Sequence, residues 1–270
     1  KNLIDQGRIG EVTTINQIEN VGYWHQAHSF VRGNWRNTAE TSPMILQKSC
    51  HDMDIILWLM GKDCKRVQSF GSLRHFTPEN APEGAPERCL DGCPHGDTCP
   101  YYAPKLYMDM NRTGWPVDVI TTDLSENGRR RALEEGPYGR CVYHCDNDVV
   151  DRQVVNLEFE GGAVATFTMT AFSADFSRQL KIFGTEGQIE ANMGTKQIVL
   201  HRFWEEKKTI PLDMGLEASG HGGGDYGIVR DMYDYFVGNE VSSQISDIGI
   251  SAENHLLVLF AHIMRLFRDI

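Results

Sequence analysis

Hydrophobic and polar residues alternate along several short stretches of the chain, with the two-residue period of half-buried β-strands. The strongest pattern covers residues 151–172, where Val155, Leu157 and Phe159 alternate with polar residues before a Gly-Gly turn. This stretch predicts a β-hairpin. Further strands are predicted over residues 11–20, 65–75, 179–184, 187–192, 196–203 and 207–212.

Three other stretches carry apolar residues at helical spacing, over residues 45–60, 225–237 and 249–268. The expected buried stripe of the first helix consists of Leu46, Cys50, Met53, Leu57 and Met60. In the strand over residues 11–20, the residues expected on one face are Val12, Thr14, Asn16 and Ile18. Because consecutive hairpin strands have few helices between them, we predict an α+β fold with an open, largely antiparallel sheet and helices on one face.

Residues 76–145 interrupt this pattern with a Cys- and Pro-rich insert, in which periodicity is weak. A structureless insert of this length is uncommon unless something ties it down. Its cysteines suggest a structural zinc, because four thiolates bind zinc tetrahedrally. The predicted ligands are Cys89, Cys93, Cys99 and Cys145, with Cys141 as a substitute. Free thiols, one disulfide and an iron–sulfur cluster are the alternatives.

Charge and composition exclude several classes of partner. The chain has 270 residues and a formal net charge of −11, and its longest basic run is Arg129-Arg130-Arg131. This balance argues against nucleic acid and anionic membranes as partners. No apolar run approaches the roughly 20 residues of a transmembrane helix. The seven cysteines, an odd number, suggest a reducing compartment, so we expect a cytoplasmic protein.

A literal G-x-G-x-x-G pattern runs from Gly222 to Gly227. The dinucleotide fingerprint requires a buried strand before its first glycine, and here a polar loop precedes it. The preferred interpretation is a glycine-rich loop that holds His221 and caps the next helix with Asp225. We therefore predict no cofactor-binding site within this chain.

Titratable residues crowd the start of the helix predicted over residues 45–60. Helical spacing puts Gln47 and Lys48 one turn before His51. Asp54 follows three residues after His51, so a neutral imidazole there could relay a proton while the carboxylate orients it. The alternative is a histidine at the edge of the core that pairs with Asp54 for structure, since charged groups are common near helix starts.

Four motifs, in order, resemble the second domain of the Gfo/Idh/MocA oxidoreductases. They are GRIGEV at residues 7–12, LQKSCHDMDIILWLMG at 46–61, FGTEGQIE at 183–190 and SAENHLLVLFA at 251–261. The resemblance implies that residues 1–270 form one C-terminal domain for substrate binding and oligomerisation, similar to that of glyceraldehyde-3-phosphate dehydrogenase. It also implies that a Rossmann domain, which binds NAD or NADP, is absent from this chain and precedes it.

The resemblance further implies functional residues. The family pattern D-x-G-x-H-x-x-D aligns its histidine, which helps move the proton of a substrate hydroxyl, with His51, and its last aspartate with Asp54. Gln47, a predicted substrate contact, and Ser49 replace the first aspartate and the glycine, so Lys48 is expected to supply part of the lost charge. The implied activity is NAD(P)-dependent oxidation of a sugar, polyol or related hydroxy compound. A homo-oligomer through the open sheet face is implied as well, and the fragment alone is expected to be inactive.

Other residues are also expected to face the substrate. Arg32, Trp35 and Arg36 lie in a predicted loop, where guanidinium groups and an indole suit sugar hydroxyls and carboxylates. A surface loop without such a role is the alternative. The motif around His221 resembles one in sugar-acting relatives, and Tyr23 is a further candidate. Two other functions stay open: NAD-dependent glycoside cleavage, and a non-catalytic sugar sensor or scaffold.

Overall fold

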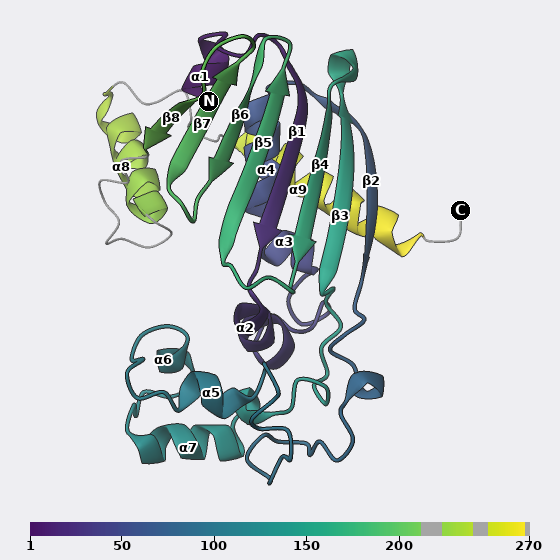
Figure 1. Cartoon of the computed structure of the whole chain (residues 1–270), viewed down its shortest axis with the longest axis vertical. Coiled ribbons are helices and arrows are strands. Elements are labelled where there is room, and N and C mark those ends of the chain that lie inside the picture. The colour runs from purple at the N-terminus through teal and green to yellow at the C-terminus, as the bar shows by residue number, and fades with distance from the viewer. Residues whose placement is uncertain (212–222, 240–247, 268–270) are drawn as a thin grey trace.

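One β-sheet forms the centre of the molecule (Figure 1). The computed structural model describes residues 1–211, 223–239 and 248–267. Within them the sheet has eight strands, in the order β2-β3-β4-β1-β5-β6-β7-β8. In chain order the strands are β1 (Val12–Asn20), β2 (Cys64–Ser72), β3 (Arg152–Phe159), β4 (Val164–Thr170), β5 (Ser177–Gly184), β6 (Gly187–Asn192), β7 (Gln197–Arg202) and β8 (Lys208–Pro211). Every neighbouring pair is antiparallel except β1 with β4, which are parallel.

Helices lie beside the sheet and in the insert. In chain order the α-helices are α1 (Asn2–Asp5), α2 (Tyr23–His25), α3 (Met44–Gln47), α4 (Cys50–Met60), α5 (Ala103–Tyr107), α6 (Val117–Ile120), α7 (Glu126–Glu135), α8 (Gly224–Val237) and α9 (Ile248–Leu266). A π-helix, η1 (Gln26–Arg32), continues α2. Short 3-10 turns are η2 (Pro78–Asn80), η3 (Pro137–Gly139) and η4 (Glu160–Gly162).

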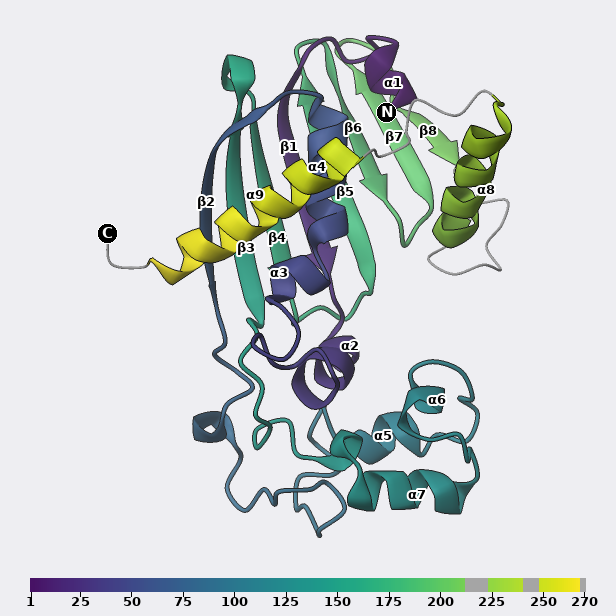
Figure 2. The same ribbon diagram turned by 180° about the vertical axis from the view of Figure 1, so that it is seen from behind.

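Helices α4 and α9 cover one face of the sheet, and none of the described helices covers the other (Figures 1 and 2). Ile56 of α4, Val258 of α9 and Phe167 of β4 are fully buried between these layers. The Asn254 side chain of α9 donates a hydrogen bond to the carbonyl of Cys50 (3.2 Å), which fixes the first turn of α4. The predicted α+β fold, an open and largely antiparallel sheet with helices on one face, is confirmed.

The predicted faces of the first strand are wrong. The register of β1 against β5 shifts near the start of β1, and such a bulge reverses the alternation along the rest of the strand. Ile15, Gln17 and Glu19 are buried, whereas Ile18 is 38% exposed. The carboxylate of Glu19 therefore lies beneath the helices, where it needs charged or hydrogen-bonding partners.

The single helix predicted over residues 45–60 is two helices, α3 and α4, which Lys48 and Ser49 separate. Ser49 has φ −107° and ψ 6°, outside the helical range, and Lys48 has a φ of −111°, well away from the usual helical value. The predicted buried stripe is only partly correct, because Cys50 and Leu57 are half-buried while Asp52 is fully buried. The break turns the helix so that a carboxylate faces the sheet.

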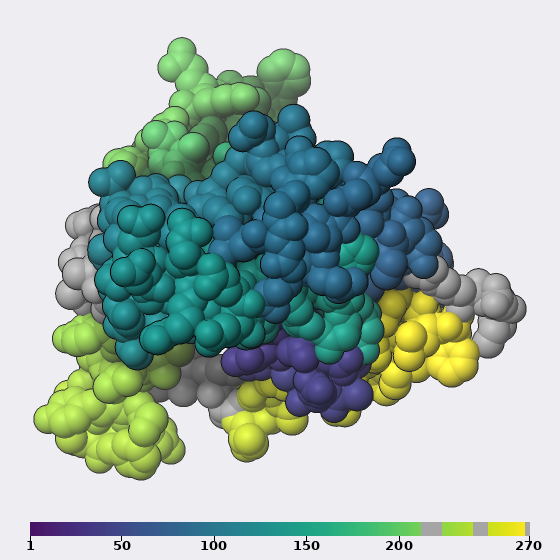
Figure 3. Space-filling view, turned by 90° about the horizontal axis from the view of Figure 1, so that it is seen from below, coloured from purple at the N-terminus to yellow at the C-terminus, as the bar shows by residue number. Residues whose placement is uncertain are grey.

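The insert, residues 76–145, lies at one end of the sheet (Figure 1), and in the view from below it spreads across most of that face (Figure 3). It has a small core of its own, which contains Cys89, Ala103, Tyr107, Val117, Leu133 and Tyr138. Its helices α5, α6 and α7 are absent from the sequence-based prediction. Each of them buries only one to three residues, too few to produce a helical period.

Arg129 of α7 ties the insert together. Its side chain is fully buried and donates hydrogen bonds to four backbone carbonyls, at distances of 2.8 to 3.1 Å. The acceptors are the carbonyls of Tyr107, Asp109, Arg112 and Leu124. Hydrogen bonds from a charged donor are about twice as strong as neutral ones, so one guanidinium fixes a segment that has little apolar surface to bury.

Replacement of Arg129 should therefore loosen the insert. Arg129→Met keeps much of the apolar volume but leaves four buried carbonyls without their donor. We expect the free energy of unfolding to fall by about 3–5 kcal/mol, with faster hydrogen exchange at the amides of α7. Urea unfolding and exchange mass spectrometry measure the two effects.

The matched control is Arg130→Met, one residue along. The Arg130 side chain is 50% exposed, and it forms an ion pair with the exposed Glu126 at 3.8 Å. We expect a change within about 0.5 kcal/mol. Equal stability of the two variants would show that Arg129 does not hold the insert together.

Candidate active site

Charged residues converge where β1 ends and α4 begins. The Arg178 guanidinium of β5 lies 2.8 Å from Asp52 of α4 and 3.1 Å from Glu19 of β1. The Lys48 ammonium lies 2.9 Å from the other oxygen of Glu19. Gln17 also donates a hydrogen bond to Asp52 (2.6 Å). Two carboxylates and two cations thus alternate beneath the helices, and we call Glu19, Lys48, Asp52 and Arg178 the buried charge cluster.

Burial sets the electrostatics of this cluster. Glu19 is 2% exposed and Asp52 is 0% exposed. Burial raises the pKa of Glu19, and the neighbouring Asp52 charge raises it further, while Lys48 and Arg178 oppose both effects. The two cations therefore favour the ionised form of Glu19 against the effect of burial.

Phe176 and His25 lie close to Lys48. Its ammonium lies 5.2 Å from the centre of the Phe176 ring, a cation–π distance. Burial and the charge of Lys48 lower the pKa of His25 to about 3, so this imidazole stays neutral. The His25 Nδ1 lies 3.2 Å from the carbonyl oxygen of Val21, to which a neutral ring can donate. The neutral imidazole of His25 therefore adds no positive charge beside Lys48.

His51 and Asp54 lie on the outer side of α4. The His51 side chain is exposed and Asp54 is half-buried. Burial raises the pKa of the Asp54 carboxyl, and the charges of His51 and His255 oppose that shift. The predicted proximity of His51 and Asp54 is thus present, although the fully buried carboxylate of α4 is Asp52 instead.

The side-chain amide nitrogen of Gln47 is hydrogen-bonded to the preceding loop. This nitrogen donates hydrogen bonds to the Thr41 hydroxyl (2.5 Å) and to the Ser42 carbonyl. Its buried side-chain oxygen has no hydrogen-bond partner among the described residues. Contact between Gln47 and a substrate stays a prediction.

Tyr23 and Arg32 line one cavity of about 390 Å³. Arg32 lies in the π-helix η1, so its predicted position in a loop is wrong. Arg32 is 2% exposed, and its guanidinium donates hydrogen bonds to the carbonyls of Tyr101 and Arg140, both at 2.7 Å. It also lies 3.7 Å from the Cys89 sulfur. Arg32 therefore joins the π-helix to the insert from inside the cavity wall.

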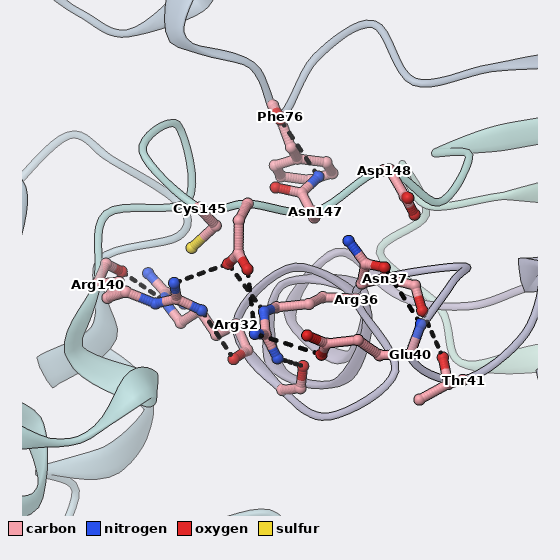
Figure 4. Close-up of polar contacts among 12 residues, drawn as sticks. Arg32, Arg36, Asn37, Glu40, Thr41, Phe76, Arg140, Cys145, Asn147 and Asp148 are labelled. Carbon is pink, nitrogen blue, oxygen red and sulfur yellow. Dashed lines mark hydrogen bonds and ion pairs between the residues drawn. The ribbon is translucent and has the colours of Figure 1, made fainter.

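Neither Trp35 nor Arg36 lines this cavity. The Arg36 side chain lies close to Arg140 of the insert (Figure 4). Arg36 and Arg140 both bind Asp146 at 2.8 Å, and these guanidinium groups hold the pKa of that carboxyl well below its usual range. Trp35 is 50% exposed. Their predicted role in substrate binding stays untested, and that of His221 falls outside the described residues.

The predicted zinc site has no support in the structure. Within residues 1–211, 223–239 and 248–267, no group of three or more His, Cys, Asp or Glu side chains is arranged to hold a metal ion. Cys89, Cys93, Cys99 and Cys141 line one small cavity, whereas Cys145 does not. Their sulfurs are free, and burial raises the pKa of Cys141 to about 11, which favours a protonated thiol.

The glycine pattern that begins at Gly222 lies partly outside the described residues. Gly223 (φ 95°) is the N-cap of α8, so this glycine supplies a backbone conformation that other residues rarely adopt. In the described part of the chain, no helix is long and apolar enough to cross a membrane.

Sequence reasoning missed several members of this site. They are Glu19, His25, Asp52, Phe176 and Arg178. Glu19 is a charged residue within a predicted strand, but its partner Arg178 is 159 positions away in sequence and no local pattern connects them.

The charge cluster makes a prediction about stability and pH. Lys48→Met leaves Glu19 with Arg178 as its cation, so at pH 8 the free energy of unfolding should fall by about 1–3 kcal/mol. Because Lys48 lowers the pKa of Glu19, its loss raises that folded-state pKa further. A folded pKa above the unfolded value favours the folded state as pH falls. The deficit should therefore shrink between pH 8 and pH 5 in urea unfolding.

Lys62→Met is the control, because Lys62 pairs with the exposed Glu11 at 2.7 Å. We expect no measurable difference from wild type at either pH. A Lys48→Met deficit that is the same at pH 5 and pH 8 would contradict the assigned coupling to Glu19.

Comparison with known sequences identifies the family. The profile of the oxidoreductase family C-terminal alpha/beta domain (GFO_IDH_MocA_C) matches residues 1–214. YteT of Bacillus subtilis (strain 168) is 26% identical over 249 residues, which are 86% of this chain and 56% of YteT. The chain thus spans a little more than half the length of this curated relative.

Solved structures share the fold at low sequence identity. Levoglucosan dehydrogenase in complex with NADH and levoglucosan has a TM-score of 0.60 and 13% identity, over 98% of this chain and 60% of that one. An NAD binding oxidoreductase from Klebsiella pneumoniae has a TM-score of 0.58 and 13% identity, over 100% and 60%. The super-repressor mutant of Gal80p from Saccharomyces cerevisiae has a TM-score of 0.59 and 12% identity, over 98% and 58%. Since the profile covers most of the chain and these folds agree with it, the chain belongs to the Gfo/Idh/MocA oxidoreductase family, as its C-terminal alpha/beta domain.

Proposed function

We propose that this chain is the substrate-binding part of an NAD(P)-dependent oxidoreductase that acts on a sugar, polyol or related hydroxy compound. The observation that carries the proposal is Lys48, whose ammonium is held 2.9 Å from buried Glu19, three residues before the exposed His51. A fixed cation and an exposed imidazole at one helix start are the groups that alcohol oxidation needs. Membership of an oxidoreductase family supports the same assignment.

The chain would contribute charge stabilisation and proton transfer. As the substrate hydroxyl loses its proton, negative charge develops on its oxygen, and the Lys48 ammonium would stabilise that charge. His51 would accept the proton and pass it to water, and the nearby Asp54 carboxylate would stabilise the imidazolium. The carbon that carries the hydroxyl would give up its hydrogen as a hydride, with both bonding electrons, and a carbonyl group would form.

NAD or NADP supplies the hydride acceptor when it is bound. We assign its binding to a dinucleotide-binding domain outside this chain, because a polar loop and not a buried strand precedes Gly222 in the sequence. The dehydrogenase solved with NADH has the same fold in the region that this chain matches, which supports the assignment.

A non-catalytic sugar sensor is the second candidate. The fold of the Gal80p super-repressor mutant matches this chain as well as that of the dehydrogenase does, so fold alone does not separate the two functions. NAD-dependent glycoside cleavage is a third, in which the cofactor is regenerated. Stoichiometric NADH formation selects the dehydrogenase, glycoside cleavage without net NADH selects the third, and sugar binding without either reaction selects the sensor.

We also propose that the open sheet face forms a homo-oligomer. This face carries the exposed apolar side chains of Ile18, Phe70 and Val164, which are 38%, 58% and 43% exposed. The light-scattering mass should be at least twice the chain mass of 30.5 kDa, and Phe70→Glu should lower it. Trp204→Glu, at a fully exposed position beyond β7, is the control that should leave the mass unchanged. A monomeric mass at high protein concentration would contradict the proposal.

His51→Asn in the complete enzyme tests the proton transfer. An amide keeps polar contacts at the helix surface but cannot exchange a proton near neutral pH. We expect kcat to fall by roughly 10² to 10⁴, with unchanged cofactor affinity and unchanged thermal stability. Steady-state kinetics and differential scanning calorimetry measure these quantities.

His201→Asn, on β7, is the matched control and should turn over normally. A His51→Asn variant with lower thermal stability but normal turnover per folded molecule would assign His51 a structural role. In that case the proposed catalytic role of His51 is wrong.

A further inference from the structure

The cavity that Tyr23 and Arg32 line lies between the π-helix and the insert. Its volume of about 390 Å³ is within the range of about 300–1,000 Å³ for small-molecule sites. One wall comes from α2 and η1, the facing wall from residues 100–112 of the insert, and Ala174 of the β4–β5 loop closes one side. Parts of the chain that are far apart in sequence therefore meet around a space the size of a sugar.

The cavity is positively charged in an acidic protein. Its lining includes Arg32, Lys105 and Arg112 and no aspartate or glutamate, although the net charge of the chain is −11. Within the described residues, Arg32 and Lys105 form no ion pair with a carboxylate, and their hydrogen bonds go to backbone carbonyls and to one sulfur. Arg112 alone has a carboxylate partner, Asp109 at 3.3 Å. Two of the three cationic side chains that line the cavity, Arg32 and Lys105, therefore have no carboxylate partner among the described residues.

Aromatic side chains supply the remaining recognition surface. Tyr23, Trp24, Tyr101 and Tyr102 all line the cavity. Tyr23 and Tyr101 pack edge to face, with ring centres 6.2 Å apart. Burial raises the pKa of Tyr101 to about 12, so its hydroxyl remains a hydrogen-bond donor. Rings with polar tips can pack on the apolar face of a sugar and bind its hydroxyls at the same time.

The Phe176 ring lies between Trp24, which lines the cavity, and the proposed catalytic Lys48. Phe176 lies 6.0 Å from Trp24, between ring centres, and the Lys48 ammonium lies 5.2 Å from the centre of Phe176. A ligand in the cavity would therefore lie on the same side of the molecule as Lys48, with Trp24 and Phe176 between them.

We propose that this cavity binds the anionic group of a carbohydrate substrate, a sugar acid or a sugar phosphate, with Arg112 and Lys105 at its entrance and Arg32 in its wall. The inference rests on the proposed function and narrows its substrate class. Guanidinium groups bind carboxylates and phosphates in the same way, so the site indicates an anionic ligand without distinguishing the two. The experiment below distinguishes a sugar acid from a sugar phosphate.

Calorimetric titration of the complete protein with three related probes tests the inference. The probes are galacturonate, galactose 6-phosphate and galactose, at low ionic strength. We expect at least one anionic probe to bind about tenfold or more tightly than galactose, and added salt to reduce that difference. Tighter binding of galacturonate than of galactose 6-phosphate indicates a sugar acid as the substrate, and the reverse order indicates a sugar phosphate.

Arg112→Gln is the informative variant. Its side chain is 54% exposed, and only its backbone carbonyl accepts the Arg129 hydrogen bond, so the insert should stay folded. We expect it to weaken the anionic probe about tenfold and to leave galactose unchanged. Arg130→Gln on α7, which does not line the cavity, should change neither affinity.

Galactose binding as tightly as both anions would overturn the inference, as would anion affinities weaker than about 10 mM or an equal loss for galactose in Arg112→Gln. Turnover with NAD(P) separates this failure from that of the proposed function. Oxidation of neutral sugars without preference for acids removes the inference and leaves the oxidoreductase. Anion binding at Arg112 without turnover of any probe leaves the inference and removes the oxidoreductase.

Discussion

The buried charge cluster of Glu19, Lys48, Asp52 and Arg178 is the constraint on which the arrangement of the site depends. An unpaired carboxylate at the position of Glu19 or Asp52 would cost several kcal/mol, because both are almost completely buried. Arg178 contacts both of them and comes from β5, so β1, β5 and α4 must meet in one arrangement. Ion pairs at about 3 Å add a directional constraint to the apolar contacts between the sheet and α4. The cluster thus fixes where α4 begins relative to the sheet.

Local patterns predicted the parts of the fold that local forces determine. The hairpin of β3 and β4 has alternating apolar residues and a glycine turn, and both are sufficient signals within 20 residues of chain. The faces of β1 could not be predicted in this way, since a bulge reverses them and Glu19 is buried only because Lys48 and Arg178 face it. A prediction that places every charged residue on the solvent-exposed face therefore reverses the two faces of such a strand.

The insert shows the same limit in another form. The sequence raised the expectation that residues 76–145 need something to tie them down, and the thiols suggested a metal. In the described residues, buried guanidinium groups take that role: Arg129 binds four carbonyls within the insert, and Arg32 joins it to the π-helix. Carbonyl acceptors have no sequence signature, because every residue carries one. Arg32 was therefore selected as a substrate contact for its charge, and its structural contacts became visible only in three dimensions.

The break between α3 and α4 explains how one short segment can serve both structure and chemistry. It turns Lys48 inward to Glu19, while His51, one turn later, stays exposed. Lys48 and burial together lower the pKa of His25 to about 3, so His25 cannot accept a proton near neutral pH. The proposed proton transfer is therefore assigned to the exposed His51 and not to His25. A continuous helix over residues 45–60 would keep Lys48 in helical geometry and lose this division between a buried cation and an exposed base.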